Sequence, residues 1–147
     1  MDFIKKNAIF PGMKSRTGDG ILRELADNMS SCTEDISSND IYDLLQKRES
    51  LCSTAIDGGL AIPHAKTNLV KGICGVLATS RDGIDFGSPD GKLTKIFFVL
   101  LSPENSTGDH LRALSQISRL FKDPSVREKI ISMKTSEEIW QFLNSSN

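Results

Sequence analysis

The chain has 147 residues, which falls within the usual domain length of about 100 to 200 residues and is enough to enclose a hydrophobic core. Its 18 basic and 19 acidic residues give a net charge of -1, so no broad cationic surface is expected to hold nucleic acid or an anionic membrane. Three cysteines without a C-x-x-C pair match neither a disulfide framework nor a zinc ribbon. No signal peptide and no run of about 18 apolar residues is present, so we expect one cytoplasmic domain without membrane insertion.

Two helices are predicted in the first third of the chain, after a short extended segment. The first covers about residues 19–29, because apolar side chains recur there at helical spacing. These apolar residues are Ile21, Leu22, Leu25 and Met29. Ser37 or Ser38 can cap a second helix, which runs through residues 41–45 and ends near Arg48. A basic side chain at that end suits the negative pole of the helix dipole.

The middle of the chain changes to short apolar runs separated by Gly, Pro, Asp and Ser, which is typical of strands. These runs are residues 59–63, 72–80 and 93–102. The last run contains the continuous apolar stretch 96–101, which predicts a strand covered on both faces by helices.

The last third returns to helical patterns. Ser106 and Asp109 have the spacing of a capping box, and a predicted core-facing stripe follows them. The stripe consists of Leu111, Leu114, Ile117 and Phe121. Two more helices are predicted to begin at Asp123 before Pro124, and at Thr135 with Glu138. Helices, then strands, then helices predict an α/β domain with a mixed sheet sandwiched between helices.

Both histidines fall where turn chemistry ends a strand or begins a helix. Pro63 holds Ile62 extended and has no N–H, so the next residue, His64, is presented on a stiff backbone. With an ordinary pKa of about 6.5, a neutral imidazole can attack phosphorus and later leave again. This favours transient phosphoryl carriage on His64, although a single histidine is more often a structural residue.

Four further residues could bind a phosphoryl group. His110 lies in the first turn of its predicted helix, where free backbone N–H groups favour an anion. The planar guanidinium of Arg48 can hold two phosphoryl oxygens, and Ser53 and Thr54 offer hydroxyl donors. Each also has an ordinary structural interpretation, as a solvated helix end or a turn former. This chemistry requires no metal and no cofactor.

The segment 48–66, with its arginine, Ser-Thr pair and Ala-Ile-Pro-His core, resembles the active-site region of the fructose- and mannitol-type enzyme IIA family. That family includes the nitrogen-related regulators. A second block, residues 110–121, resembles the helix that carries the second histidine of the family. The resemblance covers nearly the whole chain, so residues 1–147 are expected to form one type-2 EIIA domain.

The resemblance implies that His64 is phosphorylated and that His110 and Arg48 shape the pocket around the phosphoryl group. It also implies a donor like the histidine phosphocarrier HPr, and an EIIB domain or regulated proteins as acceptors. The chain carries no IIB or membrane IIC portion, which favours the nitrogen-related regulatory branch over a sugar-uptake component. Ala55 and Asp57 depart from the family, because glycines are common there, and Ala55 would be strained if its φ were positive.

Two other functions stay open at this point. The chain could be a binding module that acts on partner proteins by docking alone, without phosphorylation. It could instead be a zinc-dependent hydrolase built on the two histidines, although no histidine or cysteine pair has the short spacing that usually begins a zinc site.

Overall fold

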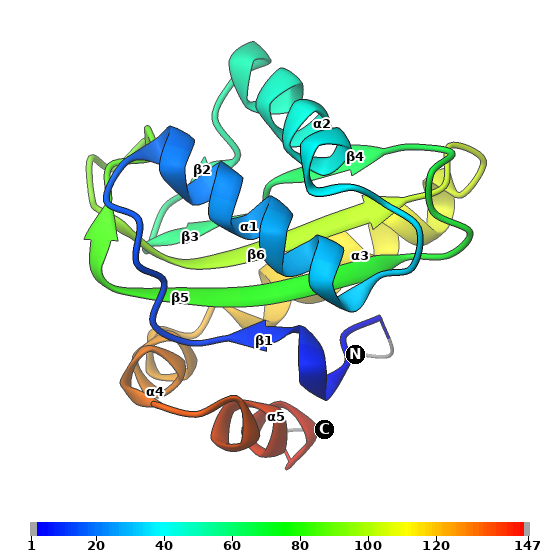
Figure 1. Cartoon of the computed structure of the whole chain (residues 1–147). Coiled ribbons are helices and arrows are strands. Elements are labelled where there is room, and N and C mark those ends of the chain that lie inside the picture. Colours follow the sequence, from blue (N-terminus) through cyan, green and yellow to red (C-terminus); the bar gives the residue numbers. More distant parts are fainter. Residues whose placement is uncertain (1–2, 146–147) are drawn as a thin grey trace.

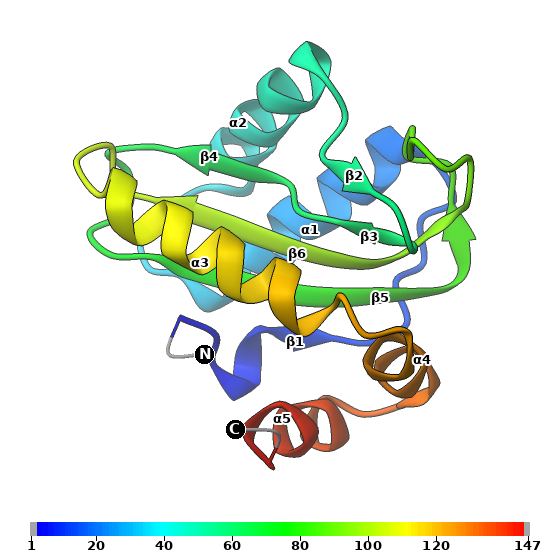
Figure 2. The same ribbon diagram turned by 180° about the vertical axis from the view of Figure 1, so that it is seen from behind.

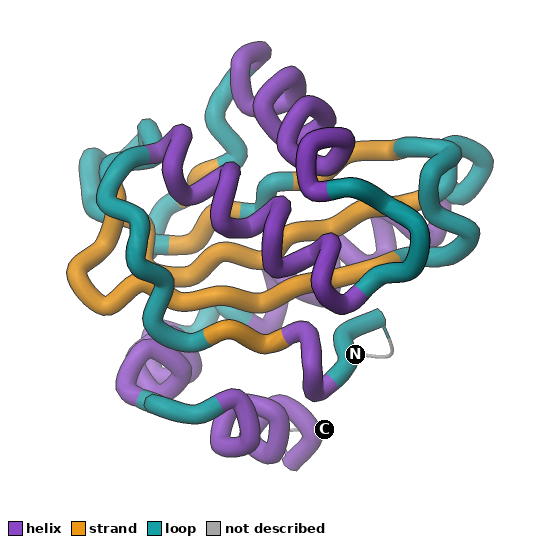
Figure 3. The backbone as a smooth tube through the Cα atoms, viewed as in Figure 1, coloured by secondary structure: helices purple, strands orange, loops and turns teal. Residues whose placement is uncertain are grey.

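A six-stranded mixed sheet forms the centre of the fold in the computed structural model, which describes residues 3–145 (Figures 1 and 3). The strands are β1 Ile9–Phe10, β2 Ala55–Ile56, β3 Leu60–Ala61, β4 His64–Lys66, β5 Cys74–Ile84 and β6 Thr94–Ser102. The prediction of an α/β fold with a mixed sheet between helices is confirmed. The predicted strand at residues 59–63 is shorter than expected, because only its Leu60–Ala61 portion pairs with neighbouring strands.

Strand β6 is the central strand of the sheet. It pairs antiparallel with β5 along one edge, and parallel with both β3 and β4 along the other. The order of the sheet is β1-β5-β6-β3-β2, with β4 beside the carboxyl half of β6. Every residue from Ile96 to Leu101 is fully buried, as expected for a strand covered on both faces.

Helices cover both faces of this sheet. Helices α1 (Gly18–Cys32) and α2 (Ser38–Leu51) pack against each other in front of the sheet in Figure 1, and α3 (Thr107–Leu120) crosses the opposite face in Figure 2. Helix α4 (Pro124–Ser132) contacts β5 and β6, and α5 (Ser136–Ser145) packs beside β1 and the short 3-10 helix Lys6–Ala8. Within residues 3–145, the helices are too short or too polar to cross a membrane.

Side chains cap three of the helices where the sequence predicts it. Ser37 Oγ accepts a hydrogen bond from the Asp40 N–H at the start of α2, at 3.1 Å. Equivalent capping bonds join Asp123 to the Ser125 N–H at 2.9 Å and Thr135 to the Glu138 N–H at 3.1 Å. Each cap satisfies a backbone donor that has no partner inside its helix, so the first turn is fixed locally.

The start of α3 differs from its prediction. Ser106 is the N-cap residue, but its side chain makes no capping hydrogen bond, and the Asp109 carboxylate instead pairs with Arg112 on the helix surface. The capping box predicted there is therefore wrong. The Ser106 backbone has ψ 42°, outside the extended conformation that N-cap residues usually adopt.

The buried face of α3 differs from its predicted stripe in the first turn, whereas Ile117 and Phe121 are buried as predicted and Leu114 is partly buried against the core. Leu111 is 59% exposed, so its predicted place in the core is wrong, whereas His110, Ala113 and Ile117 are buried. His110 has the same helical spacing to Ile117 as a core residue would, at i and i+7. A histidine therefore takes the inward position, and the apolar neighbour that follows it faces solvent.

We predict unequal stability effects for two truncations in α3. Ile117→Ala should lower the free energy of unfolding by about 2–5 kcal/mol, because it leaves a cavity in the core. Leu111→Ala should change it by less than about 0.5 kcal/mol, because its side chain faces solvent. Urea unfolding followed by circular dichroism measures both, and equal losses would contradict the assigned orientation of α3.

Candidate functional site

His64 is the first residue of β4 and is held by the pairing of this strand with β6. Its register partner is Leu100, and the Leu100 N–H donates to the Pro63 carbonyl at 3.0 Å. The half-buried imidazole places Nδ1 2.6 Å from the Ile62 carbonyl oxygen. A carbonyl can only accept a hydrogen bond, so Nδ1 carries the proton in this contact and Nε2 keeps a free lone pair.

His110 lies beside His64. The two ring centroids are 5.4 Å apart, with the ring planes inclined at 54°. His110 is only 4% exposed, and its Nδ1 lies 2.5 Å from the hydroxyl oxygen of Ser102, the last residue of β6. The structure thus brings together the two histidines that the sequence analysis selected, from strand β4 and helix α3.

Two cations flank the pair of imidazoles. Arg48, in the last turn of α2, donates from Nη1 to the Cys52 carbonyl at 2.9 Å, and its charge acts on His64. Lys66 lies two residues beyond His64 in β4, donates from Nζ to Thr107 Oγ1 at 3.0 Å, and its charge acts on His110. The sequence analysis missed Lys66, although the two-residue period of a strand would have placed it on the same face as His64.

Burial is the main cause that lowers the pKa of both histidines. For His64, the Arg48 charge adds to burial, while the hydrogen bond to Ile62 opposes it and raises the pKa. For His110, the charges of His64 and Lys66 add to burial. Both pKa values therefore lie below the ordinary value for histidine, and both imidazoles are neutral at pH 7.

Ser53 and Thr54 lie in the loop after α2, but their hydroxyl groups are used within the fold. Ser53 Oγ donates to the Phe86 carbonyl at 2.5 Å, and Thr54 Oγ1 donates to the carboxylate of Glu49. Thr54 is only 6% exposed. In this geometry neither hydroxyl proton is directed to a phosphoryl group, so the two residues shape the loop that leads towards His64.

The left-handed backbone positions before His64 are glycines. In the loop between α2 and His64, Gly58 has φ 95° and Gly59 has φ 82°. The non-glycine residue with positive φ among residues 3–145 is Asp35, which lies outside this loop. Ala55 lies in strand β2 and pairs with Ala61. The steric cost that a positive φ would impose at Ala55 therefore does not arise.

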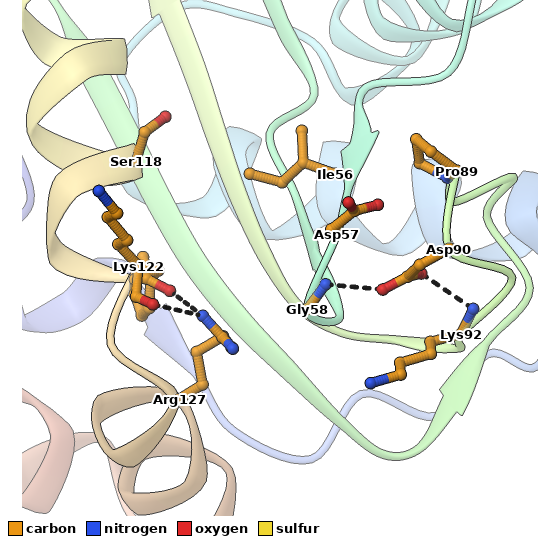
Figure 4. A pocket seen from close by; sticks show the side chains of 10 residues that line it. Ile56, Asp57, Gly58, Pro89, Asp90, Lys92, Ser118, Lys122 and Arg127 are labelled. Carbon is orange, nitrogen blue, oxygen red and sulfur yellow. Dashed lines mark hydrogen bonds between the residues drawn. The ribbon is translucent and has the colours of Figure 1, made fainter.

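A separate cavity of about 700 Å³ lies at the turn that contains Asp57 and Gly58 (Figure 4). Basic side chains line it, and the Asp90 carboxylate accepts a hydrogen bond from the Gly58 N–H at 3.0 Å. The basic residues are Lys92, Lys122 and Arg127. Hydrogen bonds from Ser88 and from the backbone of Gly58 and Lys92 lower the pKa of Asp90 to about 2. His64 does not line this cavity, so Asp57 faces a different part of the surface.

Metal ligands are not grouped in the part of the chain that the structure describes. Residues 3–145 contain no group of three or more His, Cys, Asp or Glu side chains that could hold a metal ion. The zinc hydrolase alternative therefore has no ligand set there.

We predict that the pKa values of both histidines lie below 6.5, and that the free energy of unfolding depends on pH as a result. The unfolded chain binds protons at the ordinary pKa, so between that value and the lower folded values it holds more protons than the native state. Stability should therefore fall as the pH drops below about 6.5, and His64→Gln should reduce this fall. NMR titration and urea unfolding between about pH 5 and 7.5 measure both effects; a His64 pKa above 6.5 would refute the prediction.

Replacing Arg48 should raise the pKa of His64. Arg48→Gln removes the positive charge that favours the neutral imidazole, while Lys47→Gln removes one charge from an exposed neighbour in the same helix. The His64 titration by NMR should move upwards in the first variant and much less in the second. Equal shifts in both variants would mean that Arg48 acts only through net charge.

Known proteins resemble this chain over its full length. The family "Phosphoenolpyruvate-dependent sugar phosphotransferase system, EIIA 2" matches residues 2–146. A nitrogen regulatory protein of Bradyrhizobium diazoefficiens is 34% identical over 142 residues, covering 97% of this chain and 92% of the relative. The crystal structure of nitrogen regulatory protein IIA-Ntr from Neisseria meningitidis superposes with a TM-score of 0.87 at 31% identity and covers 94% of each chain.

A more distant likeness supports the fold alone. The complex of enzyme IIA mannitol and phosphorylated enzyme IIB mannitol from Escherichia coli matches with a TM-score of 0.77 at 19% identity, covering 97% of this chain and 99% of that one. The match to the family extends over both histidines and all the strands and helices described above. The chain therefore belongs to the EIIA type 2 family of the phosphoenolpyruvate-dependent sugar phosphotransferase system.

Proposed function

We propose that this chain is a phosphocarrier that accepts a phosphoryl group on Nε2 of His64. The observation that carries the proposal is the Nδ1 contact with the Ile62 carbonyl, which leaves the Nε2 lone pair free beside His110. The low pKa of His64 adds support, because the imidazole is neutral, and so nucleophilic, at pH 7. The whole domain, residues 1–147, acts as one type-2 EIIA unit.

The donor is an HPr-like phosphohistidine protein. The Nε2 lone pair of His64 attacks phosphorus and forms an N–P bond, while the N–P bond to the histidine of the donor breaks and its electron pair stays on that nitrogen. The main roles of the surrounding residues are to position the phosphoryl group and to stabilise charge on its three equatorial oxygens. Arg48 supplies positive charge near His64, and Lys66 supplies it near His110.

His110 acts as a hydrogen-bond donor to the transferred group. When Ser102 donates to Nδ1 of His110, the imidazole carries its proton on Nε2 and can donate it to a phosphoryl oxygen. Its burial at the start of α3 keeps the ring neutral and fixed in orientation. The free N–H groups of the first helical turn favour the same negative charge.

The acceptor is an EIIB-type domain or a regulated protein in the cytoplasm. The IIA mannitol complex with phosphorylated IIB supports the first acceptor, and the similarity to nitrogen regulatory proteins supports the second. Coverage favours the second acceptor: the 34% match to the nitrogen regulatory relative extends over 97% of this chain, whereas a fructose-specific EIIA component of Haloferax volcanii is 37% identical over 69% of it. We therefore place the chain in the nitrogen-related regulatory branch.

Intact-mass spectrometry tests phosphoryl carriage directly. After incubation with a phosphorylated HPr-type donor at neutral or alkaline pH, the native chain should gain one acid-labile phosphoryl group. His64→Ala should gain none, and His110→Ala should gain it more slowly, by roughly 100-fold or more, because an oriented donor is lost.

The control is the same incubation with a donor whose carrier histidine is replaced, which cannot be phosphorylated and should transfer nothing. A native chain that accepts no phosphoryl group from any active donor would support the docking-only module instead. An adduct that survives in His64→Ala would place the phosphorylated residue elsewhere.

A further inference from the structure

Glu49, next to Arg48 in the last turn of α2, binds the loop that precedes the histidine strand. Its carboxylate accepts two hydrogen bonds from Thr54: the backbone N–H donates to Oε2 at 3.0 Å, and Oγ1 donates to Oε1. Thr54 is buried and Glu49 is half-buried. Both oxygens of one carboxylate therefore hold both donors of one residue, which fixes the position and the orientation of Thr54.

Two further contacts connect Thr54 with His64 through the backbone of Ile62. The Thr54 carbonyl accepts a hydrogen bond from the Ile62 N–H at 3.2 Å, across the β2–β3 hairpin. The Ile62 carbonyl in turn lies 2.6 Å from Nδ1 of His64. Three successive contacts thus connect the Glu49 carboxylate with the imidazole, and each partner is fixed by the one before it.

Arg48 holds the same loop two residues earlier. Its Nη1 donates to the Cys52 carbonyl, while Glu49 holds Thr54, so adjacent residues of α2 fix adjacent parts of the loop. Arg48 also acts on His64 by its charge. The end of α2 therefore sets the loop geometry and the charge near the histidine together.

We propose that Glu49 is a positioning residue for phosphoryl transfer, which acts through Thr54 and Ile62 to keep the proton of His64 on Nδ1. The transfer part of this inference rests on the proposed function, whereas the effect on the His64 proton does not. Burial raises the pKa of Glu49, and the hydrogen bonds from Thr54 oppose that rise. Burial of this carboxylate is unfavourable, and its hydrogen bonds to the loop offset part of that cost.

The test compares Glu49→Gln with Asp43→Asn, an exposed acidic residue of the same helix that carries the same charge change. In Glu49→Gln the amide oxygen can still accept the Thr54 N–H, but the NH₂ group faces Oγ1 as a donor. The hydroxyl bond is then reversed, and both bonds lose the charge of the carboxylate. Two readouts are needed: the tautomer of His64 from its ring nitrogen shifts by ¹⁵N NMR, and the initial rate of phosphorylation by the HPr-type donor.

Glu49→Gln should increase the fraction of His64 that carries its proton on Nε2, and should slow phosphorylation roughly 10- to 100-fold, as expected for a displaced nucleophile. Asp43→Asn should change neither. Thr54→Ser keeps both donors and should behave like the native chain, whereas Thr54→Val loses the hydroxyl and should show a weaker form of the Glu49→Gln effect. Urea unfolding of each variant separates loss of stability from loss of positioning.

A native His64 tautomer with its proton on Nε2 would overturn the inference. So would a Glu49→Gln variant that unfolds more easily but keeps the native tautomer and rate, since Glu49 would then have only a structural role. If the native chain accepts no phosphoryl group, the proposed function fails, and the tautomer comparison alone decides whether Glu49 positions the imidazole.

Discussion

The pairing of strand β6 on both edges is the constraint on which the site depends. Its carboxyl half pairs with β4 at Leu100 and so fixes the backbone of His64. Its last residue, Ser102, holds the ring of His110. Because β6 is buried on both faces, it offers little freedom to shift along its axis. One rigid strand therefore sets the separation of two imidazoles that come from different elements.

Helix α2 and the loop that follows it orient the His64 ring. The strand fixes where the histidines lie, but the hydrogen bonds of the loop after α2 decide how the His64 ring is turned and where its proton resides. The charge on Arg48 and the burial of the rings act in the same direction and keep the imidazoles neutral. In the proposed function, a phosphoryl group on His64 would lie beside a neutral ring and within reach of the charges of Arg48 and Lys66.

Local patterns in the sequence predicted most of the fold, because helix caps, apolar spacing and continuous apolar runs act within a few residues. The fold class, the central strand and the caps of three helices were accessible in this way. The inward turn of His110 in place of Leu111 was not, because Ser102 lies outside the helix and the contact with the other histidine is long-range. The Phe86 partner of Ser53 was inaccessible for the same reason. The Glu49 partner of Thr54 is close in sequence but has no pattern of its own, since hydroxyl groups donate to whatever carbonyl or carboxylate the fold brings near.

Asp57, where the family resemblance predicts a glycine, lies away from His64. The Gly59 carbonyl accepts a hydrogen bond from the Lys95 N–H, and His64 pairs with Leu100, so the turn and the histidine are separated along β6 by roughly 16 Å at the usual rise of a strand. That distance exceeds the Debye length of about 8 Å at physiological ionic strength, so the charge of Asp57 is largely screened from His64. Asp57 instead changes the charge of a cavity lined by basic residues. Its effect therefore falls on molecules that approach this part of the surface, while the position of His64 and the charge around it are set by α2, β4 and β6.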